Sequence, residues 1–196
     1  MATSAHKLMT TIAVRYLDAA RVLNKNSPAP NALWEPLNHL FSMSLELALK
    51  AYLERVGVTE KELRKQNVRH SLYGLLLMAV EQGLRTTYEV ADVVLEMDEA
   101  HASHAYRYVP RPADGEVATV YSAHPAVAFA AIQRLLDQCA QDPAELRAKT
   151  NFPEDWLPAS LPVHPVTPGQ LDVWRRDKLS LREFAASSQK REHGVN

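Results

Sequence analysis

The segment from about residue 32 to residue 56 limits the fold of this chain more than any other part of its sequence. Its apolar residues recur at helical spacing and cover most of the circumference of a helix: Leu33, Leu37, Leu40, Phe41, Leu45, Leu47, Ala48, Leu49, Ala51 and Tyr52. Asn31 is a suitable N-cap, and Gly57 is a typical C-terminal stop. A helix that is apolar nearly all round is usually central, so we expect other helices to surround it.

Helical patterns continue on both sides of this segment. They cover residues 4–24, 71–82 and 125–140, and a further helix opens with a capping box, Thr86-x-x-Glu89. A second box at Thr59 and Glu62 predicts a short helix near residues 60–65. Glycine is scarce, with 6 residues, and this disfavours a strand-rich fold with many tight turns. The sequence therefore predicts an all-α protein, an up-and-down bundle of about five helices.

Two segments depart from the helical pattern. Residues 106–122 combine two prolines and an Asp114-Gly115 turn with a strand-like run, so we expect an irregular or hairpin-like insertion there. After residue 142 the pattern weakens, and five prolines fall between Pro153 and Pro168. We expect a bundle domain over residues 1–141. Residues 142–196 would form an extended, Pro-rich and partly flexible arm packed on the bundle, with short helices between 171 and 187.

Composition narrows the class of protein. The net charge of −1 provides no overall field that would favour nucleic acid or an anionic membrane, although it permits a local patch. The single cysteine, Cys139, cannot form an intramolecular disulfide, which fits a reducing compartment. It lies on an apolar helix face, so we expect it to be a small core residue. No apolar run approaches ~18 residues, and charged residues interrupt the N-terminal stretch. We expect a cytoplasmic protein without a membrane partner.

Glu46, Lys50 and His70 are conspicuous polar residues in the leucine-rich stretch 44–83. Glu46 and Lys50 are four residues apart, a spacing that suits an exposed ion pair on a helix. Alternatively, Glu46 lies in a crevice between helices and binds a histidine or arginine from elsewhere in the chain. His70 is either a loop or capping residue before the helix at 71–82, or it approaches Glu46 and gains a partner for its charged form.

Further candidates lie at the end of the helix that opens near residue 86. His101 and His104 continue the apolar stripe of that helix, and two histidines at this spacing are an incomplete metal site. His39, Glu46 or His70 would have to complete it, so hydrogen-bonded histidines are the preferred interpretation and no metal is assigned. Arg107 and Tyr108 place a planar cation beside an aromatic ring, which suits either the last carbonyls of the helix or a phosphate and a base.

Three short motifs resemble the HEPN superfamily of helical bundles. They are Ser44-Leu45-Glu46-Leu47-Ala48-Leu49-Lys50, then His70-Ser71-Leu72 before an apolar helix, and then Arg107-Tyr108 after the helix with the two histidines. The resemblance covers about residues 8–109. It implies a bundle that forms a homodimer and acts in RNA cleavage, in toxin–antitoxin or defence systems, or as a nucleotide-binding partner of a nucleotidyltransferase.

Catalytic members of that superfamily resemble one another in an arginine and a later histidine on a late helix, with four to six residues between the two. In this chain the spacing occurs only at Arg64 and His70, before the helix at 71–82, whereas His101 and His104 precede Arg107. We therefore expect a non-catalytic bundle without a cofactor that binds a nucleotide, RNA or a protein partner. The binding residues would be Glu46, Lys50, His70, Arg107 and Tyr108.

Two alternatives remain open. One is a metal-independent ribonuclease, with His101, His104 and Arg107 as catalytic candidates and His70 as a further possible partner of Arg107. The other is a histidine-based metal-binding bundle. The hypothesis of a crevice around Glu46 makes one geometric prediction. Glu46 should lie within hydrogen-bonding reach of His70, of Arg107, or of a histidine at 101 or 104.

Overall fold

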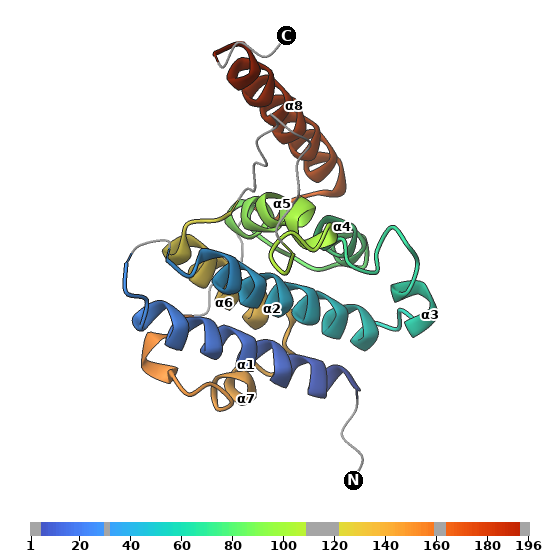
Figure 1. Ribbon diagram of the computed structural model, residues 1–196. Helices are drawn as coiled ribbons and strands as arrows, with labels where there is room; N and C mark the ends of the chain where they lie inside the picture. Colours follow the sequence, from blue (N-terminus) through green and yellow to red (C-terminus); the bar gives the residue numbers. More distant parts are fainter. Residues whose placement is uncertain (1–4, 30–31, 109–121, 159–163, 193–196) are drawn as a thin grey trace.

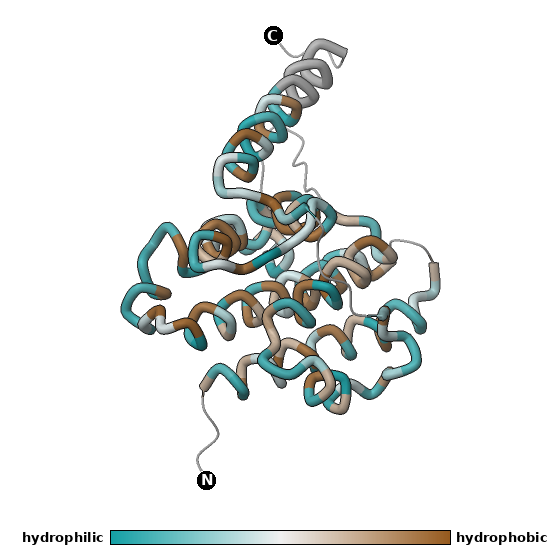
Figure 2. The backbone as a smooth tube through the Cα atoms, turned by 180° about the vertical axis from the view of Figure 1, so that it is seen from behind, coloured by the Kyte–Doolittle hydropathy of each residue, from teal (hydrophilic) through white to brown (hydrophobic). Residues whose placement is uncertain are grey.

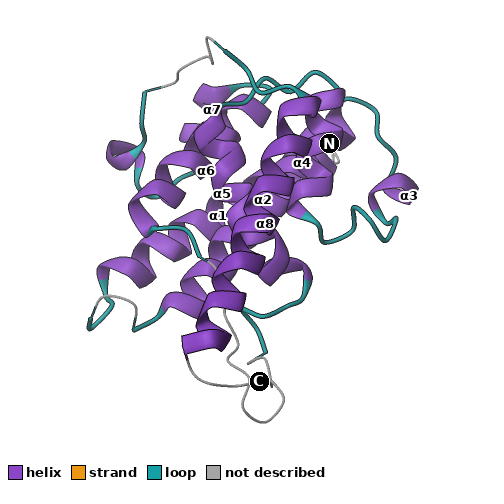
Figure 3. Cartoon of the chain, turned by 90° about the horizontal axis from the view of Figure 1, so that it is seen from above, coloured by secondary structure: helices purple, strands orange, loops and turns teal. Residues whose placement is uncertain are grey.

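The computed structural model describes residues 5–29, 32–108, 122–158 and 164–192, with residues 184–192 described as backbone only. The regular structure of these residues is entirely helical (Figure 3), which confirms the all-α class. The elements are α1 (Ala5–Lys25), α2 (Trp34–Arg55), α3 (Glu60–Leu63), α4 (Leu72–Glu81), α5 (Tyr88–Ala102), α6 (Pro125–Cys139), α7 (Pro143–Arg147), a 3-10 helix (Pro153–Asp155) and α8 (Pro168–Glu192).

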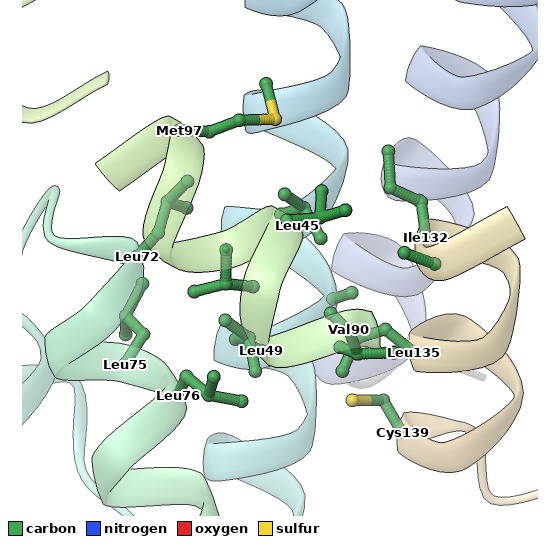
Figure 4. Close-up of a cluster of buried hydrophobic side chains, with 14 of the residues drawn as sticks. Leu45, Leu49, Leu72, Leu75, Leu76, Val90, Met97, Ile132, Leu135 and Cys139 are labelled. Carbon is green, nitrogen blue, oxygen red and sulfur yellow. The ribbon is translucent and has the colours of Figure 1, made fainter. Parts of the chain in front are cut away.

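α2 is the central helix, as its apolar circumference predicts. It contacts α1, α4, α5 and α6. Leu45 and Leu49 of α2 are fully buried, and Figure 4 shows them between the leucines of α4 and the apolar face of α6. Cys139 belongs to this apolar core. Figure 2 shows hydrophobic and hydrophilic residues alternating along the bundle helices, as expected where each helix buries one face.

Only part of the predicted capping chemistry is observed. The N-cap of α2 is Leu33, without a side-chain capping bond, and not the predicted Asn31. Thr59 and Glu62 form the predicted capping box of α3. The box predicted at Thr86 does not form, because the N-cap of α5 is Thr87 and the helix begins at Tyr88. The carbonyl of Thr86 instead accepts a hydrogen bond from the Val166 amide at 2.9 Å. This bond ties the chain before α8 to the chain before α5.

The C-terminal part packs on the bundle before it turns outward. The Thr150 hydroxyl donates to Asp18 of α1 at 2.6 Å, and the buried Trp156 indole donates to Asp137 of α6 at 3.2 Å. Where we expected short helices, α8 is one continuous helix that projects from the bundle (Figure 1). Most of the predicted hairpin-like insertion, residues 109–121, and residues 159–163 of the arm lie outside the described residues.

Candidate functional site

The centre of the candidate site is the carboxylate of Glu46, in the middle of α2. The residue is only 5% exposed. Its Oε1 accepts a hydrogen bond from the Lys50 ammonium at 2.5 Å. Its Oε2 lies 2.5 Å from Nε2 of His101, at the end of α5, and 3.4 Å from Nδ1 of His70, just before α4. One carboxylate therefore joins three segments of the bundle.

The start of α4 is fixed to α5 by a second carboxylate, that of Asp98. It accepts hydrogen bonds from the Ser71 hydroxyl and from the Tyr73 amide, both at 3.0 Å. Ser71 is the N-cap of α4 and also accepts from the Gly74 amide at 2.9 Å. Asp98 lies one helical turn before His101 on α5. These bonds hold His70, next to Ser71, on the same side of α5 as His101.

The turn that carries His70 packs closely against α4. A Cβ atom added at Gly74 would lie 2.4 Å from the carbonyl oxygen of Asn67, so only glycine fits at this position. The Lys50 ammonium donates to the carbonyl of Arg69 at 2.8 Å in addition to Glu46. Lys50 therefore connects the central carboxylate to the backbone beside His70.

The surroundings of Glu46 favour its charged form. Burial alone would raise the pKa of this carboxyl, but hydrogen bonds from His101 and Lys50 outweigh burial and lower the pKa to about 2. Glu46 is therefore ionised at any physiological pH. The alternative of an exposed Glu46–Lys50 pair is wrong, because both side chains are largely buried.

His104 lies in the turn that follows α5, in the left-handed region at φ +59°. Its ring centroid is 5.5 Å from that of His70. We expected His101 and His104 to share one inward helix face, but α5 ends at Ala102 and the chain turns away. Burial lowers the pKa of His104, and the neighbouring His70 and Arg107 lower it further.

His39 and Arg107 border the cluster on the side away from Lys50. The pKa of His39 is lowered by burial and by the positive charge of Arg107, which places the two residues near each other. The Arg107 guanidinium lies 3.5 Å from the sulfur of Met43, is exposed, and has no acidic partner among the described residues. Tyr108 is 70% exposed beside it.

The central geometric prediction is confirmed. Glu46 lies within hydrogen-bonding reach of both His70 and His101, whereas Arg107 contacts Met43 instead. The capping alternative for His70 is wrong, because Ser71 is the N-cap. Sequence reasoning missed Asp98. Its position one turn before His101 on the same helix is the signal that could have revealed it.

The fold and site define an all-α protein with a buried carboxylate that binds two histidines. Comparison with known proteins finds no matching family model, no matching curated protein and no matching solved structure. Among the described residues, no helix is long and apolar enough to cross a membrane.

Proposed function

We propose that this chain is an HEPN-like, non-catalytic protein that binds the phosphate group of a nucleotide or RNA beside the Glu46 cluster. The observation that carries the proposal is the imbalance of charge around Glu46. The Glu46 carboxylate is already paired with Lys50 and hydrogen-bonded to His101, while His39, His104 and Arg107 border the same cluster. Arg107 and any protonated histidine therefore supply positive charge in excess.

Arg107 is the residue best suited to bind phosphate. Its planar guanidinium presents paired N–H donors that match two oxygens of a phosphate group. A bound phosphate would lie near His39 and His104, whose pKa values are lowered by burial and, to a smaller extent, by the guanidinium. The exposed ring of Tyr108 provides a face on which a base can stack.

The test is the binding of AMP and of a short single-stranded RNA, measured by calorimetry in EDTA. We expect saturable binding to the wild-type chain and at least about tenfold weaker binding to Arg107→Ala, since a charge-assisted contact to phosphate contributes about 1.5–3 kcal/mol. Arg64→Ala is the matched control, because Arg64 is an exposed arginine paired with Glu60. Absence of binding to both ligands, or equal binding by Arg107→Ala, would overturn the proposal.

The same RNA separates binding from cleavage. The alternative function, a metal-independent ribonuclease, is favoured by the Glu46–His101 contact, because a carboxylate that orients an imidazole is a common arrangement in acid–base catalysis. Cleavage of the RNA in EDTA that His104→Ala abolishes would replace the binding proposal with this alternative. We expect the RNA to remain intact.

The HEPN resemblance adds a proposed homodimer and a partner such as an antitoxin or a nucleotidyltransferase. Light scattering on the purified chain tests the dimer directly. A monomer across the micromolar range would remove the dimer from the proposal and leave the phosphate site to be judged by its own experiment.

A further inference from the structure

Glu46 and two neighbouring histidines bring three potential metal-ligand atoms close together, an arrangement that phosphate binding does not require. Oε2 of Glu46, one ring nitrogen of His70 and one of His101 all lie within 4.8 Å of one another. They come from α2, from the turn before α4 and from the end of α5, so the fold brings together residues that are far apart in the sequence. Two imidazoles and one carboxylate are the protein ligands of many zinc sites that keep one position open.

The distances are close to those of a coordinated ion. Two ligands at about 2.0–2.1 Å from zinc in tetrahedral geometry lie about 3.3 Å apart. The separation of 3.4 Å between Glu46 Oε2 and His70 Nδ1 agrees with this value. The separation of 2.5 Å between Oε2 and His101 Nε2 is that of a hydrogen bond, so binding an ion requires these two atoms to move apart by about 0.8 Å.

Access to these atoms runs through His70. The His70 side chain is 40% exposed, whereas those of Glu46 and His101 are 7% and 5% exposed. An ion can therefore approach from the solvent side of His70, and a water molecule can occupy the fourth position there. His104 is near this opening, with its ring 5.5 Å from that of His70, but it does not belong to the group of three.

Lys50 is the main opposing feature, and its position limits its effect. It binds Oε1 of Glu46, the oxygen that does not face the histidines. Ligating carboxylates in metal sites are commonly hydrogen-bonded through their remaining oxygen, which fixes their orientation. The lysine charge nevertheless repels a cation nearby, so we expect the site to bind its ion less tightly than a closed structural site does.

We propose that Glu46, His70 and His101 bind a Zn²⁺ ion through Oε2, Nδ1 and Nε2, with the fourth position open to solvent. The proposal goes beyond phosphate binding, since either site can exist without the other. The His101–His104 pair that the sequence suggested is not the site, because α5 ends between the two residues.

The experiment is a zinc titration of the full chain after removal of metal with EDTA and dialysis at pH 7.5. We expect one equivalent to bind in competition with a chromophoric chelator, and the melting temperature to rise. The most informative variant is His70→Ala, because this side chain is partly exposed and its loss leaves the Glu46–His101 contact in place. We expect its zinc affinity to fall at least about tenfold, with an unchanged circular dichroism spectrum.

Two further variants complete the design. His124→Ala is the matched control, because His124 is exposed at the start of α6, and it should bind zinc as the wild type does. Lys50→Met removes the repelling charge and should bind zinc about tenfold more tightly.

Either of two results would overturn the site. The first is that the wild type does not bind one equivalent of zinc saturably. The second is that His104→Ala loses zinc binding while His70→Ala retains it. Arg107→Ala removes no zinc ligand, so it should not weaken zinc binding. Failure of the zinc site is therefore distinguishable from failure of the phosphate site.

Discussion

At the scale of single residues, Glu46 is the group on which the buried polar cluster depends most. A charged carboxylate in the interior is stable only when its partners replace the water that it loses. Glu46 meets this condition with three donors from three segments. Removing its charge leaves Lys50 and the histidines without their common charged acceptor.

We therefore expect Glu46→Gln to reduce the free energy of unfolding at pH 7 by about 3 kcal/mol, measured by urea denaturation. The pKa of Glu46 falls from 4.5 in the unfolded chain to about 2 in the folded one, so the folded state favours its ionised form. The resulting stabilisation is complete above pH 4.5 and is lost as the pH falls toward 2. The difference in the free energy of unfolding between Glu46→Gln and the wild type should therefore become smaller as the pH falls from 4.5 toward 2.

Glu60→Gln is the matched control for this experiment. Glu60 also pairs with a cation four residues away, but both side chains of that pair are exposed, and such pairs contribute about 0–1 kcal/mol. If both substitutions had the same small effect, Glu46 would not be the centre of a cooperative cluster.

At the scale of elements, α8 attaches to the bundle through the buried Leu171 and through several charged side chains. Lys178 binds Asp92 at 2.8 Å and Glu96 at 2.6 Å, both on α5, and Arg182 binds Glu99 at 3.1 Å. The Tyr73 hydroxyl of α4 donates a hydrogen bond to Asp172 of α8. Beyond these contacts α8 extends away from the bundle (Figure 1).

We expect Lys178→Ala to loosen α8 without unfolding the bundle. Amide exchange in residues 177–183 should become about threefold to tenfold faster, since the two lost ion pairs belong to a charge network, while the overall stability should change by less than about 1 kcal/mol. Arg176→Ala is the control, because Arg176 is exposed on the same helix and has no ion-pair partner among the described residues. Equal exchange in both variants would show that the ion pairs do not hold the helix.

The same elements show what could be predicted from the sequence. The position of α2 was predictable because helical periodicity is a local property. The approach of His101 to Glu46 was predictable because His101 continues the apolar stripe of α5. The continuity of α8 was not, because its stabilising partners on α5 lie more than 80 positions away in the sequence. The end of α5 at Ala102 depends on the left-handed turn at His104. No local sequence pattern predicted this turn.

At the scale of the whole molecule, the histidines near Arg107 make the free energy of unfolding depend on pH just below 6.5, a higher pH than that at which Glu46 is protonated. The pKa values of His39 and His104 lie below 6.5 in the folded chain, in both cases chiefly because of burial and then because of neighbouring positive groups. The unfolded chain therefore binds more protons than the folded chain just below pH 6.5. Stability is complete above this pH and falls as the solution becomes more acidic.

This dependence provides a final prediction that joins stability to phosphate binding. Urea denaturation of the wild type should show a lower free energy of unfolding at pH 5.5 than at pH 7.5, and the double variant His39→Ala/His104→Ala should show a smaller difference. A phosphate bound near Arg107 favours the protonated histidines, so saturating AMP should also reduce the difference, and AMP should bind more tightly at pH 5.5. His124→Ala should retain the full pH dependence. If the double variant behaved like the wild type, protonation of His39 and His104 would not cause the loss of stability, and their proposed coupling to the phosphate would fail with it.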